Sequence, residues 1–154
     1  MPVKSLIFLL AVAASAAAQQ KPDFSGEWVL NRQASTLSPA ASAMESGVLR
    51  IEHREPVFHY KAALVSGGSP VQYEYELTTD GKEGEGAQQG SRAVSSLHWE
   101  GDVLVLSSRI ERGDAVLTIS FRHELLDDGR RLRETERLRG MGRDQDNVWI
   151  FDRR

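Results

Sequence analysis

Two residues of opposite charge type are placed to meet across a predicted pair of strands. His123 and Glu134 flank Asp128-Gly129, a dipeptide typical of a two-residue turn between antiparallel strands. Such a turn sets position 125 against 132, and therefore His123 against Glu134 on the inward face. A His–carboxylate pair in an apolar interior can anchor the polar group of a ligand. The pair can equally be a satisfied structural contact, or lie exposed at an open end of the fold.

Three tyrosines are expected on the same inward face. A Gly67-Gly68 turn places Tyr60 opposite Tyr75 and Ala62 opposite Tyr73. Their hydroxyl groups could orient a ligand inside an otherwise apolar cavity, although plain core packing explains the same pattern. The ligand-binding candidates are therefore Tyr60, Tyr73, Tyr75, His123 and Glu134.

The strand that carries Glu134 alternates acidic and basic side chains. Glu134 and Glu136 are two positions apart and project to one side, a spacing that loosely suits paired-carboxylate chemistry. The opposite face holds four arginines, which we expect in solvent: Arg131, Arg133, Arg137 and Arg139. If the strand were turned over, these arginines would favour an anionic ligand in the interior.

The sequence offers no motif for catalysis or cofactor binding. Its 4 His and 0 Cys residues lack paired metal-ligand spacing. It has no Gly-x-Ser-x-Gly, phosphate loop or dinucleotide fingerprint, and Gly140-Met141-Gly142 is interpreted as a turn. We therefore expect no metal, no cofactor and no catalytic residue, and an enzyme ranks behind a binding or structural protein.

Short β runs separated by Gly-containing turns make up most of the chain. Ten strands are predicted, at 24–30, 47–54, 57–65, 71–79, 82–87, 91–100, 103–112, 115–126, 131–139 and 148–153. Two-residue hairpin signals occur at five junctions: 67–68, 80–81, 101–102, 113–114 and 128–129. The turn at 80–81 is the least clean, because it sets Glu76 opposite Glu85.

The registers set by these turns keep one face apolar from strand to strand. A meander of this kind closes into an up-and-down barrel or stacks as a sandwich, and closure removes exposed edges. We therefore predict an all-β protein, a single antiparallel barrel of about ten strands. Ser38 and Pro39 begin a short helix or loop after the first strand.

Composition indicates one ordinary domain with no affinity for polyanions. The chain has 154 residues, a net charge of −3 and no Cys. That charge is too weak and of the wrong sign to hold nucleic acid or an anionic membrane. We expect a monomer, held together by its hydrophobic core without disulfides.

Residues 1–18 have the pattern of a secretory signal peptide. Lys4 precedes an apolar run from Leu6 to Ala14, which ends in small residues. The run is too short and too rich in Ala for a stable membrane span. We therefore expect an exported protein, periplasmic or extracellular, whose domain comprises residues 19–154 and contains no integral membrane segment.

The segment Asp23-Phe24-Ser25-Gly26-Glu27-Trp28 resembles the Gly-x-Trp opening of lipocalins and fatty-acid-binding proteins. It also resembles the opening of a group of uncharacterised exported bacterial proteins. The resemblance implies a small calycin barrel, often with an apolar ligand in its lumen, and places Trp28 near the closed end in a structural role. The last strand, 148–153, lacks the Arg-x-Tyr that receives a carboxylate in fatty-acid-binding proteins. The opening is also shorter than that of haem-binding barrels.

Two functions remain open on these grounds. The first is an exported lipocalin-like barrel that binds a small, largely apolar molecule. The second is a barrel with a packed core and a structural or protein-interaction role in the cell envelope. Lumen volume separates them, and Gly84 and Gly86 are expected to leave space beside Tyr75 and Leu77.

Overall fold

Antiparallel strands joined by short connections make up most of the computed structural model, which describes residues 20–88 and 91–154. The expected signal peptide lies outside the described residues. The strands are β1 (Gly26–Leu30), β2 (Met44–Arg54), β3 (Val57–Ser66), β4 (Ser69–Thr78), β5 (Gly84–Gln88), β6 (Ser91–Glu100), β7 (Val103–Arg112), β8 (Ala115–Leu126), β9 (Arg131–Arg139) and β10 (Gln145–Arg153). All ten predicted strands are present, and β2, β4 and β10 begin two or three residues earlier than predicted.

The hairpin turns have the registers that the sequence predicts. The turns at 67–68, 101–102 and 113–114 each leave two residues between paired strand ends. Their glycines adopt the positive φ values that such turns require, for example 55° at Gly67 and 61° at Gly101. One face of β6, β7 and β8 therefore stays apolar throughout.

The turn at 128–129 is longer than predicted but keeps its register. The last pair before it is Leu126 with Arg131, and residues Asp127–Gly129 form a single 3-10 turn. Lengthening a two-residue loop by one residue on each side leaves the pairing of the strands unchanged. His123 therefore lies opposite Glu134, as the dipeptide predicted.

The barrel is nearly closed, and the predicted hairpin at 80–81 is wrong, because β4 and β5 do not pair. The strand order is β4-β3-β2-β1-β10-β9-β8-β7-β6-β5, so β1 and β10 join the two halves while β4 and β5 remain edges. The Asp80 carboxylate accepts hydrogen bonds from Thr78 Oγ1 at 2.7 Å and the Lys82 N–H at 3.2 Å. The Gly81 N–H then donates to the Leu97 carbonyl at 2.9 Å, which directs the chain toward β6 instead of back along β4.

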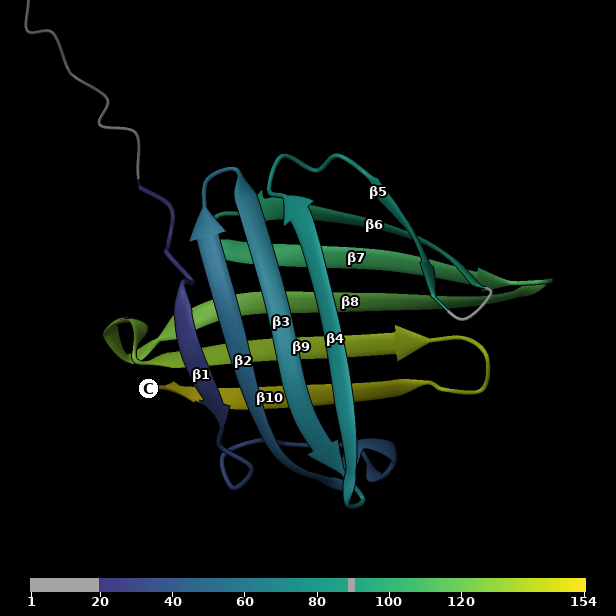
Figure 1. Cartoon of the computed structure of the whole chain (residues 1–154), viewed down its shortest axis with the longest axis horizontal. Helices are drawn as coiled ribbons and strands as arrows, with labels where there is room; N and C mark the ends of the chain where they lie inside the picture. Colours follow the sequence, from purple (N-terminus) through teal and green to yellow (C-terminus); the bar gives the residue numbers. More distant parts are fainter. Residues whose placement is uncertain (1–19, 89–90) are drawn as a thin grey trace, which may run out of the picture.

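Figure 1 shows β1–β4 crossing in front of β6–β10, so that the core lies between two sheet faces. This is an all-β up-and-down barrel. The expected short helix or loop is a 3-10 turn, η1 (Pro39–Ala41), and β2 begins soon after it at Met44. Leu37, Ala41 and Met44 in this connection pack against the core.

Candidate functional site

The predicted His–carboxylate pair exists and is buried. His123 Nδ1 lies 3.0 Å from Glu134 Oε1, and their side chains are 1% and 2% exposed. The Tyr60 hydroxyl donates to the other carboxylate oxygen, Oε2, at 3.2 Å. Strands β8, β9 and β3 thus place three polar groups at one point of the interior. An exposed pair at an open mouth is excluded.

Two buried side-chain atoms in the part of the chain that the structure describes have no hydrogen-bond partner: His123 Nε2 and the Tyr75 hydroxyl oxygen. Buried polar atoms in native proteins are nearly always paired, so two such atoms in one interior need an explanation. Each leaves a hydrogen-bonding capacity free inside the barrel.

The tyrosines form a stacked aromatic cluster around this pair. The ring centroid of Tyr60 is 5.0 Å from that of Tyr75 and 5.9 Å from that of Tyr73. Burial raises the pKa of Tyr60, Tyr73 and Tyr75, and the negative charge of Glu134 adds to the rise. All three hydroxyls therefore keep their protons at neutral pH and can donate.

Glu136 also faces inward, one row beyond Glu134. Its Oε2 accepts hydrogen bonds from Trp149 Nε1 at 2.7 Å and Asn147 Nδ2 at 2.8 Å. Burial raises the pKa of Glu136; the bonds from Trp149 and Asn147 oppose the rise, and the charge of Glu134 adds to it. Both carboxylates lie in the interior, as their spacing predicted.

The raised pKa of Glu136 gives a testable dependence of stability on pH. Below its unfolded value the carboxyl is protonated in both states, and above its folded value ionisation in the buried site costs stability. We expect the free energy of unfolding of the native chain, relative to Glu136→Gln, to fall as pH rises from about 4 to about 7. Urea titrations across this range measure the difference. Glu52→Gln, at an exposed position of β2, is the control, and parallel profiles for native chain and Glu136→Gln would contradict the prediction.

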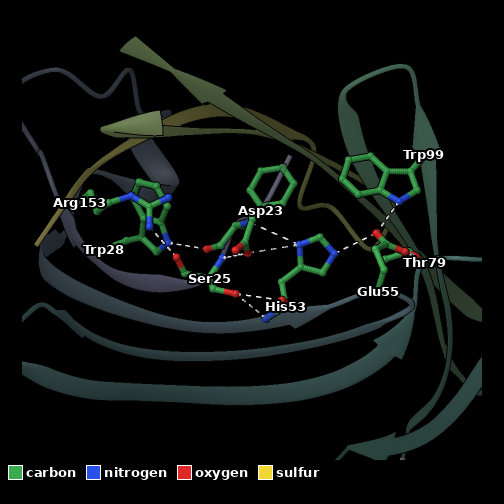
Figure 2. A network of polar contacts seen from close by, with 9 residues as sticks. Asp23, Ser25, Trp28, His53, Glu55, Thr79, Trp99 and Arg153 are labelled. Carbon is green, nitrogen blue, oxygen red and sulfur yellow. Dashed lines mark hydrogen bonds and ion pairs between the residues drawn. The ribbon is translucent and has the colours of Figure 1, made fainter. Parts of the chain in front are cut away.

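A second polar network, not predicted from sequence, closes one end of the barrel (Figure 2). His53 Nε2 lies 2.9 Å from Glu55 Oε1, which also accepts from Trp99 Nε1 at 2.9 Å. Glu55 Oε2 accepts from Thr79 Oγ1 at 2.6 Å. Burial opposes ionisation of Glu55, but the bonds from Thr79, His53 and Trp99 outweigh it and lower its pKa.

This network fastens the segment before β1 across the end of the core. The Phe24 N–H donates to His53 Nδ1 at 3.4 Å, and Ser25 Oγ donates to the His53 carbonyl at 3.0 Å. Phe24 itself is 0% exposed and stacks on Trp99 with 6.0 Å between centroids. Both ring nitrogens of His53 have a partner in this network, so its role is structural. We call this end of the barrel, formed by Phe24, His53, Glu55, Thr79 and Trp99, the seal.

The opposite part of the interior is more open. Inward-facing Ser95, Ser108, Ile110 and Ile119 are only half-buried, whereas Leu97 and Leu104 nearer the seal are 0% exposed. The expected space at Gly84 is filled, since a Cβ there would lie 2.8 Å from Leu77 Cδ2. At Gly86 a Cβ would meet nothing within 4 Å.

A hollow of about 620 Å³ is lined mainly by outward-facing residues of β6–β9, together with the inward-facing Ser95, Ser108 and Ile119. Ser96, Ser107 and Ser120 line it and alternate with inward residues of the same strands. The arginines at its rim are paired with acids, Arg109 with Glu111 at 2.7 Å and Arg139 with Asp146 at 2.8 Å. The hollow therefore carries little uncompensated charge.

The arginines of β9 point away from the interior, as expected. The side chains of Arg131, Arg133, Arg137 and Arg139 are 38%, 40%, 71% and 45% exposed. An anionic ligand held by these residues in the lumen is excluded. Trp28, the structural candidate, is 0% exposed beside the seal.

Within residues 20–88 and 91–154, no helix is long and apolar enough to cross a membrane. In the same part of the chain, His, Cys, Asp and Glu form no group of three or more placed to hold a metal ion.

Several solved structures share this fold at low sequence identity. Human cRBP IV matches with a TM-score of 0.58 and 18% identity, over 86% of this chain and 99% of that one. Secretory abundant heat soluble protein 4 from Ramazzottius varieornatus matches with a TM-score of 0.55 and 14% identity, over 89% and 99%. A Schistosoma mansoni fatty acid binding protein in complex with arachidonic acid matches with a TM-score of 0.51 and 13% identity, over 85% and 96%.

At these identities the likeness defines the fold, a calycin-type barrel, and confirms the resemblance inferred from Gly-x-Trp at that level. No protein-family model matches the chain, and no curated protein does so.

Proposed function

We propose that this protein is an exported barrel that binds a small, largely apolar molecule, with His123, Glu134 and Tyr75 as its polar anchor. The observation that carries the proposal is the pair of unpartnered buried atoms, His123 Nε2 and the Tyr75 hydroxyl. A largely apolar interior with a few convergent polar groups is the usual composition of a ligand site. The fold likeness to a fatty acid binding protein in complex with arachidonic acid supports the same class of function.

Export rests on the sequence of residues 1–18. A charged start, a short apolar run and small residues before Gln19 fit cleavage by a signal peptidase. The absence of Cys makes folding outside the cytoplasm independent of disulfide formation. We place the mature chain in the periplasm or outside the cell.

Native mass spectrometry of the protein recovered from the producing organism tests both parts. We expect a chain that begins near residue 19, together with additional non-covalent mass from a small molecule. Unfolding in the spectrometer should release that mass and identify its class. A full-length chain would overturn export, and the protein mass alone, with no uptake of an apolar dye such as Nile red, would overturn ligand binding.

The alternative is a packed-core barrel with a structural or protein-interaction role in the cell envelope. Leu77 fills the space at Gly84, and one continuous apolar cluster runs from Phe24 to Leu64 and Leu106. Under this alternative the barrel takes up no dye. Its two unpartnered buried atoms then simply lower the stability of the folded protein.

A further inference from the structure

The two unpartnered polar atoms belong to rings that pack on the same aromatic pair. The His123 ring lies 5.8 Å from Phe58 and 6.0 Å from Tyr60. The Tyr75 ring lies 6.3 Å from Phe58 and 5.0 Å from Tyr60. Both atoms are therefore parts of one cluster that strands β3, β4 and β8 assemble.

The contacts of Glu134 determine what His123 can offer. A carboxylate only accepts hydrogen bonds, so His123 Nδ1 carries the proton in the 3.0 Å contact with Oε1. In the neutral imidazole the other nitrogen, Nε2, is then an acceptor. Tyr75 keeps its hydroxyl proton and is a donor. The cluster presents one free acceptor and one free donor.

The charge of the interior is acidic. Glu134 and Glu136 both face inward. Among inward-facing strand positions that the structure describes, the basic side chains of Lys or Arg type are Arg112 and Arg153, both exposed at strand ends. Arg112 donates to Ser91 Oγ, and Arg153 donates to the Gly129 and Ser25 carbonyls. A ligand carboxylate would meet two like charges and no buried cation.

We propose that the ligand's polar group is an uncharged hydroxyl, which donates to His123 Nε2 and accepts from the Tyr75 hydroxyl, so that the barrel selects apolar alcohols over fatty acids. This inference rests on the proposed function, because it specifies the ligand of the same site. A hydroxyl group is both a donor and an acceptor, and it matches the two free atoms one for one.

A protonated amine fits the site less well than a hydroxyl. An ammonium group has three donors and no acceptor, so the Tyr75 proton would remain unpaired. Both carboxylates already accept from protein donors, Glu134 from His123 and Tyr60, and Glu136 from Asn147 and Trp149. Burying a charged ligand without a free counter-ion is strongly unfavourable.

Three probes of equal chain length separate these chemistries: decan-1-ol, decanoate and decylamine. Each competes with Nile red bound to the native chain. We expect the apparent affinity of decan-1-ol to be at least tenfold higher than that of decanoate or decylamine. Tyr75→Phe keeps the stacked ring but removes the donor, and should weaken decan-1-ol about fivefold. In ¹⁵N spectra, His123 Nε2 should show an unprotonated shift that moves when decan-1-ol binds.

Tyr73→Phe is the matched control, because Tyr73 is on the same strand, faces the same way and stacks on the same ring. Its loss of a hydroxyl should leave the decan-1-ol affinity within twofold of the native chain. Equal or tighter competition by decanoate or decylamine would overturn the hydroxyl assignment, as would equal effects of Tyr73→Phe and Tyr75→Phe. Those results leave dye binding intact, whereas a chain that binds no dye refutes the proposed function itself.

Discussion

Replacing Trp28 by Ala is expected to cost about 3–5 kcal/mol of folding stability, the range for truncating a large buried aromatic side chain. Trp28 is 0% exposed, and its Nε1 donates to the Phe24 carbonyl at 3.0 Å. The Arg153 guanidinium lies over its ring at 4.1 Å. Truncation therefore leaves a cavity in the core. It also removes the hydrogen bond to Phe24, in the segment before β1, and the aromatic ring that the Arg153 guanidinium covers. Urea denaturation, followed by far-ultraviolet circular dichroism, measures the loss.

Two variants make this experiment specific. Trp28→Phe keeps an aromatic ring in the core but loses the bond to Phe24, so its loss should be smaller than that of Trp28→Ala. Val71→Ala is the control, since Val71 is 39% exposed and its truncation should change stability by at most about 0.5 kcal/mol. If Trp28→Ala lowers the free energy of unfolding no more than Val71→Ala does, the seal does not depend on Trp28.

The register of the barrel could be predicted because turn chemistry is local. A Gly-Gly, Gly-Asp or Asp-Gly pair determines which residues face each other, and alternation then assigns every side chain to a face. His123 met Glu134 even though its turn is longer than predicted. The same arithmetic placed Tyr60 opposite Tyr75 and Glu136 on the inward face. These predictions required no knowledge of distant contacts.

The seal and the open seam could not be predicted in that way. Glu55 meets Trp99 across 44 positions and Thr79 across 24, and neither distance is implied by any single hairpin. The Asp80-Gly81 pair looks like the other turns, but the Asp80 side chain caps its own backbone and the chain departs toward β6. The predicted hairpin would set Glu76 directly opposite Glu85. This pair of like charges was the one local sign that β4 and β5 do not pair.

Removing one partner of the buried pair is expected to cost as much as removing Trp28. Glu134→Leu leaves His123 Nδ1 and the Tyr60 hydroxyl without an acceptor, and the loss should be about 3–5 kcal/mol, as for other broken buried pairs. In His123→Phe, the Glu134 carboxylate keeps the Tyr60 hydroxyl as a donor but loses His123. We expect a similar loss of folding stability. Urea denaturation of each variant at neutral pH gives the two losses.

The double variant, His123→Phe with Glu134→Leu, distinguishes a structural role of the pair from a role in ligand binding. Replacing both partners of a buried hydrogen bond by apolar groups of similar size can be nearly neutral, so the double variant should be more stable than the sum of the single losses predicts, by about 1–3 kcal/mol. A purely additive result would mean that the two side chains do not interact in the folded protein. If the pair were only structural, the recovered double variant would bind decan-1-ol as the native chain does. Because the anchor supplies the acceptor for the ligand hydroxyl, we expect instead a stable barrel that still takes up Nile red but has lost its preference for the alcohol over decanoate.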